Sequence, residues 1–390
     1  MKSDLKGRAE PIRVLQILGG LFHGGAEAMI MSLYRHMDTS KVQFDFLVHT
    51  DQEGVYDKEI IDCGGKIHHA PEYHGYNHFA YKAWWQSFLK EHPEYHILHF
   101  HIRGTAAIVI PIAKRMGRIT IAHSHSTGNG KSIKATLKNV LQHSLKNQAD
   151  YLFACSEPAA IWLFGKKVLR ADNFFLWKNA IEANKFSFNQ DIRQKMRTSF
   201  DYDDGFVIGH VGRFIPAKNH MFLLDVFSEI YKQNPKARLL LIGDGELRFS
   251  IEQKIQSMHL DDVITLAGAR SDVQDCLQAM DVFLFPSLFE GLGIVAIEAQ
   301  ASGLPCIVSD SIPQEVKMSE LLTFVSLKES IAYWAQLVLS HYEKVRKAGK
   351  IELIKKAGYD IMESAQSLET FYLNPKKRIL VNTQQMLHHE

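Results

Sequence analysis

The chain has 390 residues, of which 46% are hydrophobic and 23% charged, a composition typical of a folded globular protein and not of a disordered or fibrous one. This length suits two domains of comparable size with a cleft between them. Forty-five basic and forty-three acidic residues leave a formal charge of +2, so the chain shows no global signal for nucleic-acid binding, and any basic surface must be local.

The four cysteines, Cys63, Cys155, Cys276 and Cys306, are widely spaced and match no CxxC or zinc-ligand pattern. We expect reduced thiols in the core of a cytosolic protein. The first ten residues lack the apolar stretch of a secretory signal, and no run approaches the roughly 18 apolar residues of a membrane-spanning helix. The sequence therefore predicts a cytoplasmic protein, with peripheral contact at the inner face of the membrane as an open alternative.

Short apolar runs recur along the whole chain, each followed by a stretch with helical spacing. This pattern predicts an α/β fold with a doubly wound parallel sheet in each half and helices on both faces. The expected strands are residues 12–18, 43–49, 97–101, 119–123 and 151–154 in the first half, and 207–211, 237–242, 263–267, 282–286 and 306–309 in the second.

Residues 173–190 mix turn formers and lack a sustained period, so we place the interdomain crossing there. We expect an N-terminal acceptor-binding domain over 1–178, a C-terminal donor-binding domain over 179–372, and a tail over 373–390 that packs back on the N-terminal domain. Residues 359–373 are expected to form a helix, which Pro375 ends.

The first strand runs into a glycine-containing turn before a helix, with Gly24 and Gly25 next to that helix. Glycines there let a ligand approach the backbone, and the N–H groups of the helix terminus can bind a phosphate. A tight turn that needs positive φ would explain the same glycines. The strict G-x-G-x-x-G spacing of dinucleotide-binding folds is absent.

A later strand of the first half ends in the segment RITIAHSHST. The expected strand ends at His123, whose side chain we place at the carboxyl edge of the sheet, where open α/β folds bind ligands. We take His123 as a catalytic candidate and His125 as the second choice. A structural role is the alternative, because the chain has twenty histidines.

The second half opens with a strand and the loop GRFIPAKNH, which carries Arg213 and Lys218. An arginine fork and a lysine point charge together suit a diphosphate, although a solvated basic loop would look similar. Gly243 ends the next strand in a close-approach turn, and Arg270 follows the strand after it. We expect these groups to line one face of the cleft.

The segment FEGLGIVAIEA carries the clearest chemistry. Glu290 closes a strand, Gly291 and Gly293 form a turn, and a helix from about Ile294 carries Glu298. The turn N–H groups and the helix dipole can hold a diphosphate, while a carboxylate can accept hydrogen bonds from both hydroxyls of a ribose. Complementarity to the helix dipole explains either glutamate alone but not the pair.

This E-x7-E pattern resembles the retaining glycosyltransferases of family 4, whose GT-B architecture has two Rossmann-like, doubly wound parallel-sheet domains facing across a cleft. The motifs GRFIPAKNH, GDGELR, GARSDV, AMDVFLFPS, EGLGIVAIEA and SGLPCIVSD follow in the family's order, so the resemblance covers almost the whole chain. The segment WKNAIE resembles the family's interdomain hinge, with Ala180 in place of the usual glycine.

The resemblance implies that Arg213 and Lys218 bind the donor pyrophosphate, that Glu290 and His123 lie near the transferred sugar, and that Glu298 binds the ribose. Further donor-binding residues implied are Gly24, Gly25, Gly243, Arg270, Gly291, Leu292, Gly293, Ile294 and Val295. No D-x-D metal motif follows a strand, so we expect neither a metal nor a cofactor.

The implied activity is transfer of a hexosyl group from a nucleotide diphosphate, with UDP expected by family habit, to a glycan or lipid-linked oligosaccharide of exopolysaccharide or capsule synthesis. The resemblance implies retention of configuration by a front-face mechanism. The alternatives are a nucleotide-sugar epimerase on the same fold and a non-catalytic protein that binds sugar nucleotides. The glycine spacing disfavours a nicotinamide dehydrogenase.

Residues 131–146 form a basic amphipathic pattern, with apolar residues on one helical face and lysines elsewhere. Such a helix can rest on anionic lipid or pack its apolar face on its own domain, and the second reading is favoured because the pattern is generic. For Trp84 and Trp85 we likewise expect core packing in preference to a membrane-interface role.

Overall fold

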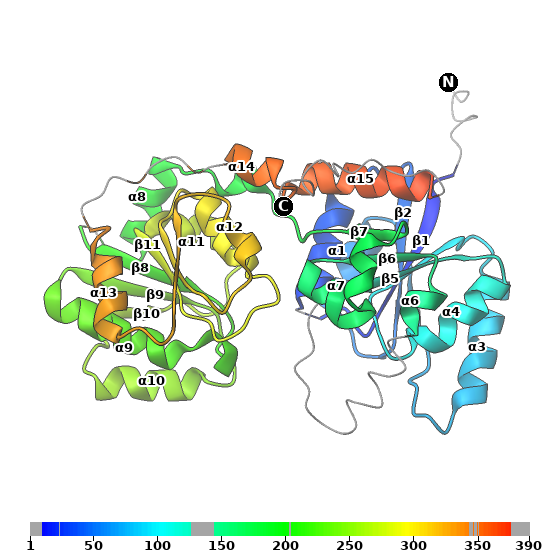
Figure 1. The fold of residues 1–390 in the computed structure, drawn as a ribbon, viewed down its shortest axis with the longest axis horizontal. Coiled ribbons are helices and arrows are strands. Elements are labelled where there is room, and N and C mark those ends of the chain that lie inside the picture. Colours follow the sequence, from blue (N-terminus) through cyan, green and yellow to red (C-terminus); the bar gives the residue numbers. More distant parts are fainter. Residues whose placement is uncertain are drawn as a thin grey trace. The chain divides into compact units, whose positions relative to one another are not determined.

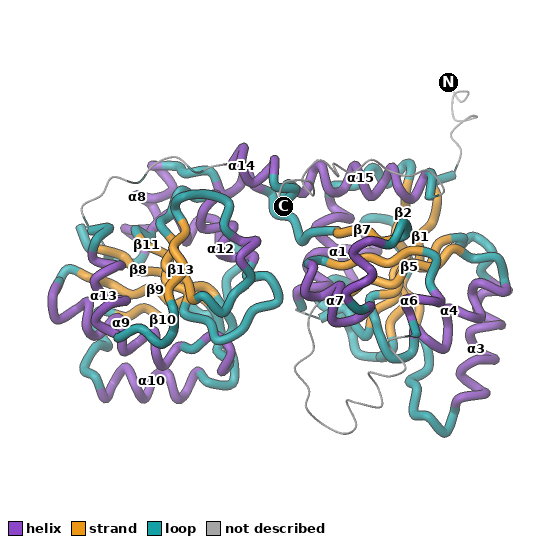
Figure 2. Tube along the Cα trace, viewed as in Figure 1, coloured by secondary structure: helices purple, strands orange, loops and turns teal. Residues whose placement is uncertain are grey.

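A computed structural model describes residues 10–22, 24–125, 144–202, 204–342, 346, 349 and 351–375. The chain divides into two units, the first made of residues 1–180 and 361–390 and the second of residues 181–360 (Figure 1). Each unit is built around its own parallel sheet, drawn in orange in Figure 2.

The sheet of the first unit has seven parallel strands in the order β3-β2-β1-β4-β5-β6-β7. The reversal of order on either side of β1 is the doubly wound arrangement. The strands are β1 (Ile12–Leu18), β2 (Val42–Val48), β3 (Ile67–His69), β4 (Ile97–Phe100), β5 (Ile119–Ser124), β6 (Tyr151–Ala154) and β7 (Phe174–Leu176).

Alternate residues of these strands enter two separate cores, one on each face of the sheet. One core joins Leu15 and Ile17 to helices α3, α4, α6 and α7; the other joins Val14 and Leu18 to α1, α2 and α15. The helices are α1 (Gly25–Arg35), α2 (Asp57–Asp62), α3 (His78–Glu91), α4 (Ala106–Arg115), α6 (Leu145–Gln148), α7 (Glu157–Phe164) and α15 (Ile361–Leu373), with the short turn η1 (Lys166–Arg170).

The second unit has a six-stranded parallel sheet in the order β10-β9-β8-β11-β12-β13, again reversing at its first strand. The strands are β8 (Phe206–Val211), β9 (Ala237–Ile242), β10 (Ile264–Leu266), β11 (Val282–Phe285), β12 (Cys306–Ser309) and β13 (Leu322–Val325).

Helices cover both faces of this sheet as well. Val207 and Leu240 face the core that contains α11, α12 and α14, whereas Ile208 and Leu241 face the core that contains α9, α10 and α13. The helices are α8 (Gln190–Ser199), α9 (His220–Gln233), α10 (Arg248–Ser257), α11 (Val273–Ala279), α12 (Ile294–Ala301), α13 (Ile331–Leu339) and α14 (Ile351–Lys356), with short turns η2 (Ala183–Phe186), η3 (Pro216–Lys218) and η4 (Gln314–Val316).

The ten strands expected from the sequence all occur, within one or two residues at their ends. Three of the four edge strands of the described sheets, β3, β7 and β13, were not expected from the sequence. Strand β7 lies at the start of the segment that we expected to be only a crossing.

The expected domain limits need correction at the C-terminal end. The helix expected over 359–373 exists as α15, but it belongs to the first unit and not to a second domain ending at residue 372. Leu368 and Phe371 of α15 pack in one core with Phe44 and Phe46 of β2, because this face of the first sheet would otherwise expose apolar side chains. The division between the units falls after Ala180, two residues beyond the expected limit.

Other expectations about single residues have mixed outcomes. Cys155, Cys276 and Cys306 are buried free thiols, but Cys63 is exposed at the end of α2, so its expected core position is wrong. Trp85 is fully buried in the core, as expected. The basic amphipathic pattern lies outside the described residues, except for its last three positions. Among the described helices, none is both long and apolar enough to cross a membrane.

One ion pair ties the first strands of the chain together. Arg13 on β1 donates from Nε and Nη2 to both carboxylate oxygens of Asp45 on β2, at 2.5 and 2.6 Å. The side chain of Asp45 is completely buried and also accepts from the backbone N–H of Lys66, just before β3, at 2.6 Å. A single carboxylate therefore satisfies donors near three neighbouring strands.

We expect Asp45→Ala to lower the free energy of unfolding of the first unit by about 3 kcal/mol, because it leaves a partly buried guanidinium without its partner. Urea titration followed by circular dichroism measures this loss. Asp62→Ala is the control, because its pair with Lys58 is exposed, and it should cost less than about 1 kcal/mol. Equal losses in the two variants would contradict the assignment.

Candidate active site

The sequence motifs of the second unit gather at the carboxyl edge of its sheet. The loops after β8, β9 and β11 begin at Gly212, Gly243 and Pro286, and all three strands are parallel and adjacent. Parallel strands end at the same edge, which is where open α/β sheets bind ligands.

Two of the expected catalytic residues contact each other directly. Lys218, in the turn η3, donates from Nζ to Oε1 of Glu290 at 2.6 Å. Their side chains are only 16% and 11% exposed, so the pair is largely shielded from water. The same ammonium lies 4.9 Å from the ring centroid of Phe285, the last residue of β11. The sequence placed both charged groups at this edge but did not indicate that they form a pair.

The loops that carry this pair are fixed to each other by hydrogen bonds. Asn219 adopts the left-handed conformation with φ of 58° and donates from its side chain to the carbonyl of Pro286 at 3.1 Å. The N–H of Leu288 donates to the carbonyl of Ala217 at 2.8 Å. Asparagine tolerates positive φ better than most residues, which explains its place after Lys218.

Gly243 permits a close contact between two of these loops. Its φ is +140°, and a Cβ atom built there would lie 2.0 Å from the carbonyl oxygen of Gly212. No other residue fits that space without moving the backbone after β8. The close approach expected at Gly243 is therefore to the backbone of Gly212 in the neighbouring loop.

Glu298 lies in the second turn of α12. The helix starts after Gly293, whose φ of +88° lets the chain turn sharply from the preceding loop. Glu298 is half-buried, and within the described part of the chain its carboxyl group has no hydrogen bond or ion pair. Burial raises the pKa of its carboxyl group to about 7. A carboxyl group with a raised pKa and no partner is a candidate for a binding site.

The two arginines expected at the donor site differ in their surroundings. Arg213 is exposed and has no ion pair with any described residue, so its guanidinium is available for an anion. Arg270 is held by Asp272 through two hydrogen bonds of 2.7 and 2.5 Å. Its guanidinium also lies 5.7 Å from the ring centroid of Phe200.

His123, Gly24 and Gly25 belong to the first unit. Gly24 is the N-cap of α1 and Gly25 its first residue, so these glycines begin a helix as expected. His123 is the second-last residue of β5 and only 3% exposed. Its Nδ1 lies 3.1 Å from Nε2 of His99 on β4.

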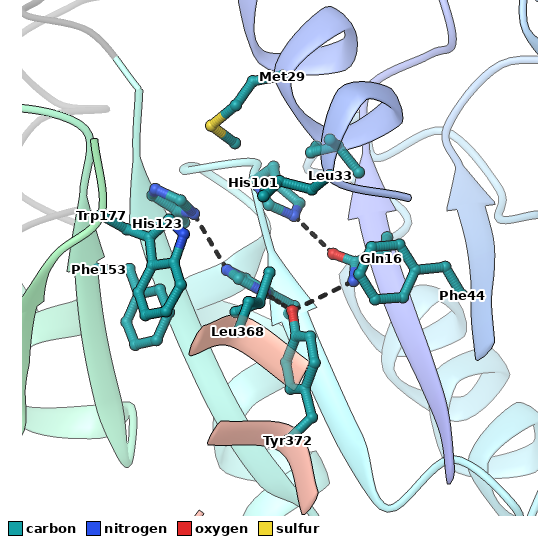
Figure 3. A pocket seen from close by; sticks show the side chains of 12 residues that line it. Gln16, Met29, Leu33, Phe44, His101, His123, Phe153, Trp177, Leu368 and Tyr372 are labelled. Carbon is teal, nitrogen blue, oxygen red and sulfur yellow. Dashed lines mark hydrogen bonds between the residues drawn. The ribbon is translucent and has the colours of Figure 1, made fainter. Parts of the chain in front are cut away.

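Sequence reasoning missed most of the environment of His123. His99, His101, Gln16 and Tyr372 line the same small cavity, as the close view in Figure 3 shows. The segments HFH at 99–101 and HSH at 123–125 contained the signal, because alternate residues of adjacent strands share one face. Tyr372 could not be found in this way, since it comes from the C-terminal helix.

We expect Lys218→Met and Glu290→Gln each to destabilise the second unit, because each leaves a largely buried group without its partner. The double variant should lose less than the sum of the single losses, with a coupling energy of about 1 to 2 kcal/mol in urea unfolding. The pair Glu229 and Lys232 on α9 is the control, since it is mostly exposed and should couple by less than about 0.5 kcal/mol. Strict additivity at Lys218 and Glu290 would contradict the contact.

Comparison with known proteins agrees with this architecture. Residues 191–330 match the family described as glycosyl transferases group 1, and residues 23–185 match Glycosyltransferase Family 4. The putative glycosyltransferase EpsF of Bacillus subtilis is 34% identical over 372 residues, covering 92% of this chain and 96% of that protein. An Escherichia coli galactosyltransferase named for UDP-Gal and GlcNAc-diphosphoundecaprenol is 29% identical, over 57% of this chain and 59% of its own length.

Solved structures give the same fold. HepE of Anabaena, crystallised with UDP and glucose, superposes with a TM-score of 0.74 at 17% identity, covering 93% of this chain and all of that one. WaaG, a glycosyltransferase involved in lipopolysaccharide biosynthesis, has a TM-score of 0.61 at 14% identity, over 93% and 95% of the two chains. Because both families match in order and EpsF is similar over nearly its whole length, the chain belongs to the group 1, family 4 glycosyltransferases and is a glycosyltransferase of the GT-B fold.

Proposed function

We propose that this glycosyltransferase moves a sugar from a UDP-sugar to a lipid-linked oligosaccharide in polysaccharide biosynthesis, with retention of configuration and without a metal ion. The observations that carry the proposal are the pair of Lys218 and Glu290 in the loops after β8 and β11, and the carboxyl group of Glu298 in α12, the helix that follows β11. Together they combine a cation, a helix N-terminus and an unpartnered carboxyl group, which are the groups that a nucleotide diphosphate needs.

The donor diphosphate is assigned to Arg213, Lys218 and the backbone around α12. Arg213 has no ion pair among the described residues, and Lys218 needs only to exchange one oxygen of Glu290 for one of phosphate. The N–H groups of Gly291, Leu292, Gly293, Ile294 and Val295 belong to the loop and first turn of the helix. Charge that grows on the leaving diphosphate meets these prearranged donors, each worth roughly 3 to 4 kcal/mol in the transition state.

Glu290 is assigned to the transferred sugar and Glu298 to the ribose. When a phosphate oxygen replaces Glu290 as the partner of Lys218, Glu290 can accept hydrogen bonds from sugar hydroxyls. Glu298 lies in the second turn of α12 and can accept from both ribose hydroxyls once it is ionised. Of the remaining donor-binding residues, Arg270 is assigned to the base and Gly24 and Gly25 to the β-phosphate. Gly243 is assigned to the turn beside the diphosphate.

Retention follows if the acceptor hydroxyl attacks from the face that the diphosphate leaves. In that geometry the leaving phosphate oxygen takes the proton of the acceptor, so no protein base is required. Burial lowers the pKa of His123 well below its ordinary value, so its imidazole is neutral and serves as a hydrogen-bonding group for the sugar and not as a cation.

The names of relatives support the choice of donor and acceptor. The Escherichia coli relative is named for a UDP-linked galactose and a diphosphoundecaprenol acceptor, and a relative of Staphylococcus aureus is named for capsular polysaccharide biosynthesis. The latter is 24% identical over 93% of this chain. These names favour UDP over GDP or ADP, and a lipid-linked glycan over a free sugar.

UDP should bind more tightly as the pH rises from about 6 to about 8, because the pKa of Glu298 is about 7 and only the ionised carboxylate accepts from both ribose hydroxyls. Isothermal titration with UDP, GDP and ADP measures this dependence. Glu298→Gln keeps the volume but cannot ionise, so its affinity for UDP should fall about tenfold at pH 8, equivalent to about 1.4 kcal/mol.

The pH dependence of UDP binding should be weaker in Glu298→Gln, and the part that remains belongs to the phosphate itself. His123→Ala is the matched control in the other unit, where we expect unchanged UDP affinity and slower turnover. Equal pH dependence in wild type and Glu298→Gln would remove the ribose assignment. Binding of NAD but of none of the three nucleotides would remove the proposed donor class.

We expect full transferase activity in EDTA, because cations and helix N–H groups supply the positive charge that a metal supplies elsewhere. The assay is transfer from UDP-glucose or UDP-galactose to a lipid-linked acceptor after dialysis against EDTA. A complete loss that magnesium restores would contradict metal independence without affecting the assignment of UDP.

A further inference from the structure

Four histidines share one buried face of the first sheet. His99 and His101 follow the alternation of β4, and His123 and His125 that of β5, so all four side chains point to the same side. Helices α1 and α15 cover this side. His99 and His123 are 2% and 3% exposed, and the rings of His123 and His125 have centroids 4.0 Å apart.

The four rings are connected in two pairs, and Gln16 of β1 joins the pairs. In one branch, Oε1 of Gln16 lies 2.8 Å from Nε2 of His101, whose Nδ1 lies 2.7 Å from Nε2 of His125. Gln16 therefore reaches His125 through a single intervening ring.

The other branch passes through the hydroxyl group of Tyr372 on α15. Nε2 of Gln16 donates to this hydroxyl at 3.3 Å, and the hydroxyl lies 2.7 Å from Nδ1 of His99. Nε2 of His99 then lies 3.1 Å from Nδ1 of His123. Figure 3 shows this branch as a continuous row of dashed contacts.

All four imidazoles are neutral. Burial lowers the pKa of His99, His101 and His123 well below the ordinary value, and it lowers that of His125 to about 3, with the nearby charge of Arg103 adding to the effect. A neutral imidazole has one N–H donor and one bare nitrogen acceptor, so the hydrogen bonds determine the position of every proton.

Only one arrangement of protons satisfies both branches when the Gln16 amide lies as described. His101 must donate from Nε2 to the amide oxygen, so its Nδ1 accepts from Nε2–H of His125. Tyr372 accepts from the amide and must donate to Nδ1 of His99, whose Nε2–H donates to Nδ1 of His123. All four histidines are then Nε2–H tautomers.

The outer ends of the two branches differ in kind. Nε2–H of His123 is a donor and Nδ1 of His125 is an acceptor, and both atoms are buried without a partner in the described part of the chain. If the amide of Gln16 turned by 180°, every ring would change to the Nδ1–H tautomer, and the two ends would exchange roles. One end is a donor and the other an acceptor in both states.

We propose that Gln16 and Tyr372 are positioning residues that hold the four histidines in one common tautomer, so that His123 and His125 together present one donor and one acceptor to a hydroxyl group. A hydroxyl both donates and accepts, so it complements this pair in either state of the amide. The arrangement of protons does not depend on the reaction; only the identification of that hydroxyl as one on a sugar rests on the proposed function.

A transition metal is the competing occupant. One nitrogen each of His99, His101 and His123 lies within 4.8 Å of the others, and neutral imidazoles are good ligands. However, a metal would have to replace the His99–His123 and His101–His125 contacts, which already use the nitrogens between the rings. The hydrogen-bonded array is therefore the better account of the same atoms.

The test is nitrogen-15 NMR of the full chain with labelled histidine, which distinguishes N–H from bare ring nitrogens, with each signal assigned by a single substitution. In wild type we expect the same tautomer at all four positions. In Gln16→Glu the carboxylate accepts from both His101 and Tyr372, so His99 and His123 should become Nδ1–H while His101 and His125 stay Nε2–H.

Tyr372→Phe should leave His101 and His125 in one tautomer and produce a mixture at His99 and His123, because the donor to His99 is lost. The control is Tyr151→Phe, whose hydroxyl donates to the carbonyl of Pro375 in the same C-terminal segment without contacting a histidine. It should change none of the four rings, so a general loosening of this segment is distinguished from the loss of the Tyr372 bond.

Glycerol is the probe for the hydroxyl, since it needs no nucleotide. We expect it to shift Nε2 of His123 and Nδ1 of His125 together in wild type, and to lose this effect in Gln16→Glu, where both ends accept. Identical tautomers in wild type and Gln16→Glu, doubly protonated rings, or ring nitrogens that change on addition of EDTA would overturn the proton arrangement. A glycerol shift at neither ring would overturn the hydroxyl site alone, and UDP binding would remain as a separate measurement of the proposed function.

Discussion

Parallel strand pairing is the constraint on which the rest of this structure depends. Every strand pair in the described residues is parallel, so within each sheet the carboxyl ends of all strands lie at one edge. This brings together Lys218 and Glu290, which are 72 residues apart in the chain. It also places His99 beside His123 on neighbouring strands of the other sheet. In each unit the strand order therefore determines which loops lie next to one another at this edge.

A parallel sheet with helices on both faces exposes neither face to water, so polar groups buried there need hydrogen-bond partners. The first unit satisfies this requirement with a helix from the far end of the chain. Tyr372 of α15 contacts both Gln16 and His99, while Leu368 and Phe371 complete the apolar core around them. The C-terminal helix thus belongs structurally to the N-terminal unit, and that unit is incomplete without it.

The second unit has an ion pair at the carboxyl ends of its strands, whereas the first unit has neutral imidazole rings there. In the pair of Lys218 and Glu290 two largely buried ions neutralise each other, and Gly243 lets the supporting loops approach within contact distance. Glu298 lacks a partner among the described residues, and its raised pKa reflects that burial. A buried carboxyl group without a partner does not add to stability, which is the physical reason for the ribose contact proposed for Glu298.

Hydrophobic runs, glycine turns and the order of motifs were sufficient to predict from the sequence ten of the thirteen described strands, the α/β class, the family and the candidate residues. These features are local, because a buried strand must be apolar and a tight turn needs glycine wherever they occur. The edge strands β3, β7 and β13 were not found in this way, and the exposure of Cys63 at the end of α2 depends on what packs there.

Only the tertiary structure decided which side chains meet. Nothing near Tyr372 in the sequence indicates His99, and nothing near Glu290 indicates Lys218. These contacts arise from strand register and from the path of α15, which bring distant residues within hydrogen-bonding distance. The sequence by itself determined the fold and the chemistry available at its edges, whereas the pairing of those groups required three-dimensional packing, because hydrogen bonds depend on distance in space and not along the chain.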